Sequence, residues 1–249
     1  MTRIAIIADI HGNLLALQAV IADLSCRAVT QVVNLGDHAS GPLWPAATLD
    51  LLMEQSWLPI AGNHDRQLVH QPPSQHGASD RYAYAQLREE HREWLRALPP
   101  VARLHPAILL CHGTPADDSR YLLETVAHGG MRLALPAEIR QRLGDVPESV
   151  VLCGHTHRPR LVQLDETTLI NPGSVGLPAY EDSAPEPHLL ENGSPHARYA
   201  LIDATSSGWQ VSFITVAYDH QAAAAQAERN GRPDWARALR TGRMELFDS

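Results

Sequence analysis

The side chains with the clearest chemical potential follow an apolar run at residues 58–61. Gly62 ends that run, and Asn63, His64 and Asp65 then place an amide, an imidazole and a carboxylate in immediate succession. Four other apolar runs also end in side chains that can bind metal ions. These side chains are Asp9 and His11, Asp37, His112, and His155 and His157. We therefore predict that five strand ends contribute to one site.

Two pairs of these residues share the spacing i, i+2, namely Asp9 with His11 and His155 with His157. In an extended segment this spacing turns both side chains to the same side. We expect each pair to bind one metal ion or two neighbouring ions.

The ligand types indicate which metals would bind. Imidazole nitrogens and carboxylate oxygens without thiolate suit Mn²⁺, Fe, Zn²⁺, Co²⁺ or Ni²⁺ better than Ca²⁺ or a structural zinc. With the amide oxygen of Asn63, the set is too large for one ion. We predict two divalent transition-metal ions, with Mn²⁺ the preferred candidate, bridged by Asp37 and roughly 3.5–4 Å apart.

The charge of such a centre points to a reaction. Two divalent ions carry four positive charges, and Asp9, Asp37 and one bridging hydroxide remove only three of them. The remaining positive charge favours a phosphoryl anion, and such a centre lowers the pKa of bound water to about 7. We predict phosphoester hydrolysis with a metal-bridging hydroxide as nucleophile. His64, beside a ligand but on the opposite side of the chain, is the predicted general acid.

The elements that must position these residues alternate in type. Residues 4–8 predict a central strand that is apolar on both faces, followed by a helix. Asn13 either only caps that helix or touches the substrate phosphate. Residues 31–35 and 58–60 predict further strands, with a helix over residues 46–55. This alternation predicts a layered α/β core with the site outside the carboxyl ends of its strands.

The remaining segments are less regular. Residues 66–100 predict a helical flank on the core, with one charged helix over residues 82–98, and residues 115–143 a loosely helical stretch. Short strands after His157, with no helices between them, suggest a second sheet packed on the first. Residues 180–197 hold three prolines and a glycine and indicate an irregular excursion.

Length and composition fit one domain with a small appendage. We assign residues 1–217 of the 249 to this domain and residues 218–249 to a helical tail packed on it. Cys26, Cys111 and Cys153 form no CxxC motif, and strand alternation turns the last two into the core. Reduced thiols indicate a cytoplasmic protein.

The charge pattern limits the range of partners. A formal net charge of −8 and the absence of a Lys/Arg block argue against general affinity for nucleic acid or anionic membranes. We expect no signal peptide and no membrane-spanning segment. The expected partner is a small phosphoester substrate, and the oligomeric state stays open.

The five polar blocks, in this order, resemble the signature blocks of the calcineurin-like metallophosphoesterase superfamily. The resemblance spans residues 4–176, because the turn at residues 171–176 is similar to one in the small bacterial and archaeal phosphodiesterase branch. It implies a four-layer αββα sandwich of two mixed β-sheets flanked by helices, and His64 as the acid. It also implies two ligand sets that share one residue: Asp9, His11, Asp37 and His157 on one metal, and Asp37, Asn63, His112 and His155 on the other.

One departure from the family pattern bears on the substrate. Phosphoprotein phosphatases of this superfamily extend the second block with an aspartate that supports the catalytic His and an arginine that clamps phosphate. The chain has Ser40 and Gly41 at these positions. We therefore expect a phosphodiesterase, with a phosphomonoesterase or phosphoprotein phosphatase as the alternative. Asp65 is the residue we would expect to support His64. A non-catalytic interaction scaffold is the competing class of function.

Overall fold

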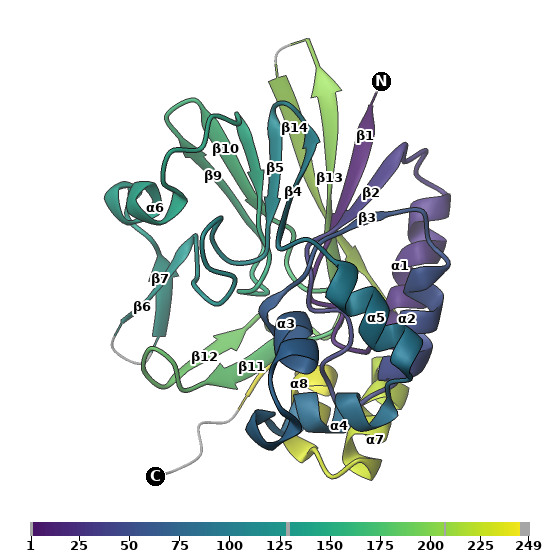
Figure 1. Cartoon of the computed structure of the whole chain (residues 1–249). Coiled ribbons are helices and arrows are strands. Elements are labelled where there is room, and N and C mark those ends of the chain that lie inside the picture. Colours follow the sequence, from purple (N-terminus) through teal and green to yellow (C-terminus); the bar gives the residue numbers. More distant parts are fainter. Residues whose placement is uncertain (1, 128–129, 207, 245–249) are drawn as a thin grey trace.

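Two five-stranded sheets form the core of the computed structural model, which describes residues 2–127, 130–206 and 208–244 (Figure 1). Three strands of the first sheet are parallel neighbours, and β13 and β14 extend this sheet antiparallel beside β1. The first sheet contains, in order, β14 (Gly208–Val216), β13 (Ala197–Thr205), β1 (Arg3–Ile7), β2 (Gln31–Asn34) and β3 (Leu58–Pro59). The predicted central strand at residues 4–8 is confirmed, because β1 lies in the middle of this sheet.

The second sheet is also mixed. Its three inner strands are parallel, and an antiparallel strand closes each edge. It contains, in order, β4 (Val101–His105), β5 (Ile108–Cys111), β8 (Val150–Leu152), β10 (Thr167–Asn171) and β9 (Arg160–Leu164).

Alternation along the strands produces the layers. Ile4 and Ile6 of β1 point between the sheets and pack with Leu110 and Val150 of the second sheet. Ala5 on the other face of β1 packs with helices on the outside of the first sheet. These helices are α1 (Leu14–Ser25) and α2 (Pro45–Met53).

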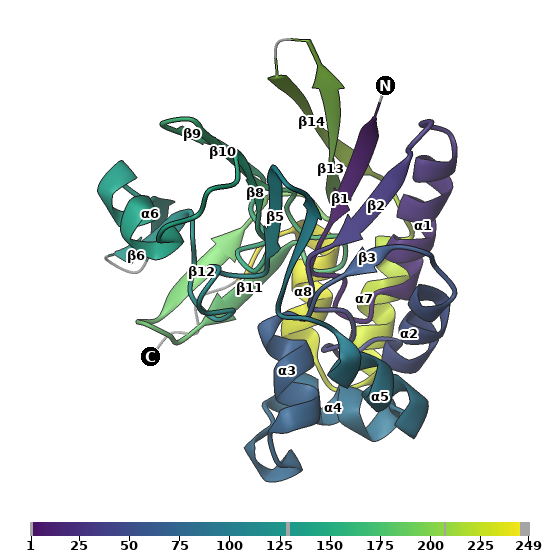
Figure 2. The same cartoon turned by 45° about the horizontal axis from the view of Figure 1, so that its top comes forward.

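On the far side of the molecule, α6 (Pro136–Leu143) covers the second sheet (Figure 2). Cys111 and Cys153 are buried in this outer layer, as predicted. The four-layer αββα sandwich is therefore confirmed.

Three expectations about the connections were wrong. Residues 115–143 are helical only in α6 at their end, because β6 (Glu124–Ala127) and β7 (Gly130–Leu133) form an antiparallel pair before it. Residues 180–197 are not an irregular excursion, because β11 (Ala179–Asp182) and β12 (His188–Glu191) form a hairpin. The strands after His157 do not all belong to the second sheet, because β13 and β14 join the first.

The helical flank consists of three α-helices. It contains α3 (Asn63–His70), η1 (Pro73–Gln75), α4 (Ala78–Gln86) and α5 (Glu89–Ala97). The single helix expected over residues 82–98 is interrupted, because Leu87 and Arg88 have extended backbone conformations. Asn13 caps α1 and binds the carbonyl of Gly176 and the hydroxyl of Tyr218.

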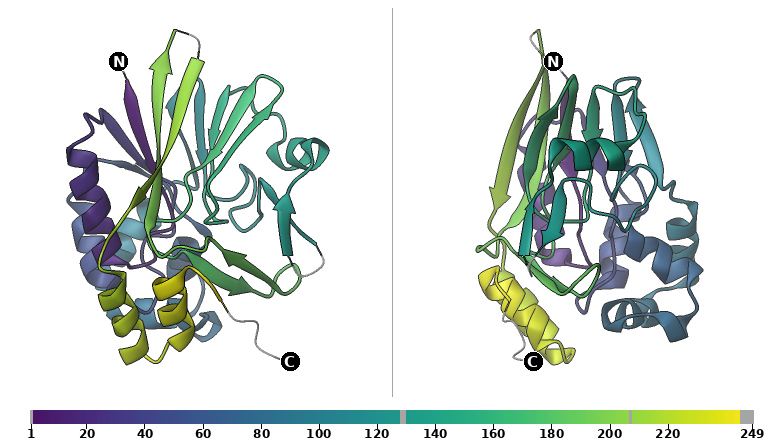
Figure 3. Two further views of the ribbon diagram at one scale, coloured as in Figure 1. Left: turned by 180° about the vertical axis from the view of Figure 1, so that it is seen from behind. Right: turned by 90° about the vertical axis from the view of Figure 1, so that its left-hand side faces the viewer.

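The predicted helical tail contains α7 (His220–Arg229) and α8 (Pro233–Thr241), which lie side by side (Figure 3). Their buried alanines pack with Leu43 and Leu177. Residue 1 of the predicted domain and residues 245–249 of the tail lie outside the described residues. Among the described residues, no helix combines the length and hydropathy that a membrane span requires.

Candidate metal centre

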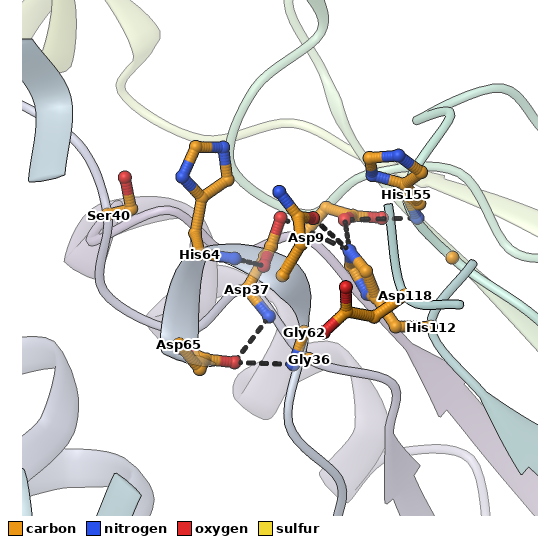
Figure 4. Close-up of polar contacts among 12 residues, drawn as sticks. Asp9, Gly36, Asp37, Ser40, Gly62, His64, Asp65, His112, Asp118 and His155 are labelled. Carbon is orange, nitrogen blue, oxygen red and sulfur yellow. Dashed lines mark hydrogen bonds and ion pairs between the residues drawn. The ribbon is translucent and has the colours of Figure 1, made fainter. Parts of the chain in front are cut away.

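The predicted ligands meet at the carboxyl ends of the strands, and Figure 4 shows four of them, Asp9, Asp37, His112 and His155. Asp9 and His11 follow β1, Asp37 follows β2, and Asn63 follows β3. The second sheet contributes His112 after β5, and His155 and His157 after β8. Six of the seven form two groups whose ligand atoms lie within 4.8 Å of one another, namely Asp9, His11 and His157, and Asp37, His112 and His155. The seventh, Asn63, adjoins the second group, because its Oδ1 lies 3.0 Å from Nε2 of His112.

Asp37 lies between the two groups. Its Oδ2 is 3.7 Å from Nε2 of His11 in one group and 3.3 Å from Nε2 of His112 in the other. Its second oxygen, Oδ1, accepts a hydrogen bond from the backbone N–H of His64 at 3.0 Å. This position of Oδ2 is compatible with the predicted bridging role, which stays a prediction.

The local backbone differs from the extended conformation that we expected for the i, i+2 pairs. Asp9, His11, Asp37, His155 and His157 all have φ between 52° and 69°, in the left-handed region. Only two other non-glycine residues in the described part of the chain share it, Ala28 and Asp165. Such conformations cost energy and concentrate at functional sites, where the surrounding structure holds them. The predicted ligands therefore converge through strained turns.

Hydrogen bonds determine which nitrogen of each imidazole faces the centre. The Nδ1–H groups of His11, His112 and His157 donate to the backbone carbonyls of Ser40, Leu35 and Leu177, at 2.7, 2.7 and 2.8 Å. His155 is reversed, because its Nε2–H donates to the carbonyl of Ser119 at 3.1 Å. Each ring therefore directs its other nitrogen inward, as metal-binding histidines do.

Two features of this arrangement fit cations. Nε2 of His11 and Nε2 of His157 are 3.1 Å apart, and in the neutral tautomers just described both are acceptors. Oδ2 of Asp9 is buried without a hydrogen-bond partner. Facing lone pairs and a bare carboxylate oxygen are unfavourable unless a positive charge lies between them. The donor set therefore fits divalent metal ions.

The charge states without metal follow from burial and mutual proximity. Burial lowers the pKa of His11 to about 4 and that of His155 to about 3, so both are neutral at pH 7. Burial, reinforced by the charge of Asp37, raises the pKa of Asp9 to about 8. Burial alone would lower the pKa of His112, but Asp37 and Asp9 outweigh it and raise this pKa to about 10. The metal-free centre therefore holds protons that metal ions would displace.

The predicted acid, His64, stands at the edge of the centre. Its ring is 5.6 Å from that of His11, and its Nδ1 lies 2.9 Å from Oδ1 of Asp80 on α4. Burial lowers the pKa of His64, but Asp37 and Asp80 outweigh burial and raise it to about 9. With Nδ1 held by Asp80, Nε2 is the atom free to exchange a proton.

Asp65 does not support His64, contrary to our expectation. Its carboxylate accepts hydrogen bonds from the backbone N–H groups of Asp37, His38 and Gly62 at 2.8–3.0 Å. Gly62 must approach Asp37 closely, because a Cβ on Gly62 would lie 2.2 Å from Oδ1 of Asp37. Asp65 thus ties the turn that bears Asp37 to the start of α3.

A cavity of about 830 Å³ opens beside the centre. His11, Asp37, Asn63, His64, His155 and His157 line it on one side. The opposite wall comes from segments outside the five blocks, namely residues 117–126, the β11–β12 hairpin and the start of α8.

Sequence reasoning missed Asp80 and the residues of this wall. Asp80 lies 16 residues after His64 in a charged helix, and no motif marks it. The only signal in the chain was Ser40, whose presence where relatives have a supporting aspartate implied that another carboxylate was needed.

Comparison with known proteins identifies the family of this chain and structures that share its fold. The family model described as the calcineurin-like phosphoesterase superfamily domain matches residues 2–191. An uncharacterized protein of Methanocaldococcus jannaschii is 24% identical over 259 residues, which cover 94% of this chain and 95% of that protein.

Two solved structures share the fold. A metallophosphoesterase from Sphaerobacter thermophilus aligns with a TM-score of 0.75 at 24% identity, over 97% of this chain and 99% of that one. A hypothetical protein from Pyrococcus horikoshii aligns with a TM-score of 0.74 at 20% identity, over 98% and 100%. The family match covers most of the chain, and the strand-end side chains lie where the five blocks predicted them. This chain therefore belongs to the calcineurin-like phosphoesterase superfamily.

Proposed function

We propose that this protein is a dinuclear-metal phosphodiesterase. The proposal rests on the position of Oδ2 of Asp37. This oxygen is 3.7 Å from Nε2 of His11 in one ligand group and 3.3 Å from Nε2 of His112 in the other. One carboxylate lies between two sets of ligands, and hydrogen bonds hold the imidazoles of each set in the tautomer that a metal ion requires. This arrangement suits two ions and not one.

The ligand sets we propose are those implied by the family resemblance. Asp9, His11 and His157 would hold one ion and Asn63, His112 and His155 the other, with Asp37 shared. When bound, two divalent transition-metal ions, with Mn²⁺ our first choice, supply hydroxide at neutral pH and neutralise charge on the phosphoryl group.

The remaining chemistry belongs to this chain's own residues. Asp80 holds Nδ1 of His64, so Nε2 of His64 carries the proton that the leaving oxygen takes up. His64 stays a third exposed and lines the cavity, so a substrate can reach it. Its backbone N–H also donates to Asp37, which couples the acid to the shared ligand.

The proposed preference for diesters rests on the second block. Ser40 and Gly41 offer no guanidinium beside Asp37 to bind the additional charge of a monoester dianion. Phosphomonoesters and phosphoproteins are accordingly the alternative substrates.

The test measures metal content and turnover together. The Mn²⁺-reconstituted protein should contain close to two ions per chain and hydrolyse bis(p-nitrophenyl) phosphate faster than a phosphoserine peptide. One bound ion with full activity would exclude the dinuclear centre. Efficient peptide dephosphorylation without diesterase activity would exclude the substrate class. Two ions without turnover of any phosphoester would favour the scaffold.

A further inference from the structure

A second cavity, of about 310 Å³, adjoins the cavity of about 830 Å³ beside the candidate metal centre. Tyr180, Glu181, Arg232 and Trp235 line both cavities, so the smaller one continues the larger one away from the metals. It lies between the β11–β12 hairpin and helix α8, which are neighbours in the fold (Figure 3). Helix α8 lies outside residues 2–191, the part of the chain that the family model matches.

Two aromatic rings mark the passage between the cavities. The ring of Tyr180 is 4.8 Å from that of His157, and its hydroxyl bonds the hydroxyl of Tyr121 at 2.9 Å. The ring of Trp235 is 6.0 Å from that of His11. Both rings are therefore held against predicted metal ligands, at a fixed distance from the reacting centre.

Gly41 permits the position of Trp235. A Cβ on Gly41 would lie 2.8 Å from Cη2 of Trp235 and 2.4 Å from the carbonyl oxygen of His11. The residue that would carry an arginine in phosphoprotein phosphatases therefore has no room for a side chain here. The indole of α8 occupies the adjacent space.

Arg232 provides a cation at the same passage. Its guanidinium lies 5.6 Å from the ring of Trp235 and is fixed by bonds to Asp234 and to Oγ of Ser79 at 2.8 Å. These bonds leave N–H groups on Nη1 and Nη2 without a partner among the described residues. A preorganised guanidinium of this kind suits phosphate or ribose oxygens.

From these observations we infer that the second cavity is a subsite for the heteroaromatic base of a nucleotide. A flat base can stack on the ring of Tyr180 or of Trp235, and the carboxylate of Glu181 and the hydroxyl of Ser183 can accept its N–H donors. Arg232 contacts the sugar-phosphate part, and the scissile phosphoryl group reaches the metals. This inference rests on the proposed function and specifies its substrate class as nucleoside phosphodiesters.

Titration calorimetry tests the subsite without turnover, using adenosine 5′-monophosphate and ribose 5-phosphate on the Mn²⁺-reconstituted protein. Stacking of a base on aromatic side chains predicts that the nucleotide binds at least about tenfold more tightly. Ser183→Trp, on the exposed tip of the hairpin, fills the second cavity and should bring the two affinities to within about threefold. Arg232→Gln should weaken nucleotide binding about tenfold.

The matched control is Ser25→Trp, an equally exposed serine on α1, which should retain the wild-type ratio. Equal affinities in the wild-type protein, or an unchanged ratio in Ser183→Trp, would overturn the subsite. If diesters are hydrolysed but the nucleotide does not bind more tightly than ribose 5-phosphate, only the subsite is contradicted. If the nucleotide binds more tightly but no diester is hydrolysed, only the proposed function is contradicted.

Discussion

The side chains of the metal centre and those of the opposite cavity wall are held by different kinds of partner. In the centre, the imidazoles of His11, His112 and His157 are fixed by backbone carbonyls. In the wall, side chains fix one another, as Tyr180 does with Tyr121 and Arg232 with Ser79.

The comparison indicates how the molecule divides its tasks. A carbonyl anchor depends on the fold and not on the identity of a distant side chain, so the centre requires only a correctly built strand end. The wall depends on individual side-chain pairs from segments far apart in the chain. We therefore expect substitutions in the centre to abolish chemistry and substitutions in the wall to change selectivity.

The largest expected effect is that of Asp37→Asn. Because Asp37 lies between both ligand groups, the change should weaken both metal sites and lower kcat/KM by more than about 10⁴-fold, beyond what a proton donor contributes. Elemental analysis and diesterase kinetics would measure this. The matched control is Asp165→Asn, an exposed aspartate with the same left-handed backbone, which should retain activity. Loss of only one ion in Asp37→Asn would contradict a shared ligand.

The second largest loss of activity is expected for His64→Ala. Loss of the acid should lower kcat/KM for an alkyl or ribosyl diester by about 10²–10⁴-fold, roughly 3–5 kcal/mol, with metal content unchanged. The value of kcat/KM for a nitrophenyl ester should fall little, because nitrophenolate departs without a proton. His70→Ala, an exposed histidine on the same helix, serves as control. A uniform loss accompanied by loss of metal would instead make His64 a ligand or a structural residue.

The metal affinity of the centre should depend on pH. At pH 7 the metal-free centre holds protons on Asp9, with a pKa of about 8, and on His112, with a pKa of about 10. Binding must displace both, so apparent affinity should rise with pH, by up to roughly 100-fold per unit below pH 8 and roughly tenfold per unit between pH 8 and 10. Calorimetry at pH 7 in buffers of different ionisation enthalpy should detect the two protons released by these ligands, with a further contribution from bound water that becomes hydroxide. Release of none would show that other groups form the site.

Asp80→Asn should give the smallest of these effects. Asp80 orients His64 without touching the reacting atoms, so its loss should cost about 10–100-fold, as for other residues that orient a functional side chain. The loss should again be confined to substrates with poor leaving groups. In a His64→Ala background the same change should have almost no further effect, because the two residues act as a unit. Additive losses of activity in the double variant would show that Asp80 does not act through His64.

Local sequence determined the strand ends and the residues that follow them. Apolar runs such as residues 4–8 and 150–153 must be buried strands, and parallel strands bring their carboxyl ends to one edge. The convergence of the seven predicted ligands and His64 on one site was therefore predictable from the order of residue types alone. The left-handed turns were not, because the i, i+2 spacing does not distinguish them from an extended segment.

Tertiary structure decided everything that depends on contacts between distant segments. Whether β13 joins the first or the second sheet depends on which strand it pairs with, and its apolar run at residues 199–202 is compatible with both. Likewise, both Asp65 and Asp80 follow His64 in the sequence and carry a carboxylate. The packing of α4 brings Asp80 to Nδ1 of His64, whereas the carboxylate of Asp65 already accepts hydrogen bonds from backbone amides. Trp235 reaches His11 across more than 200 residues because Gly41 leaves space for it, a fit that no local pattern encodes.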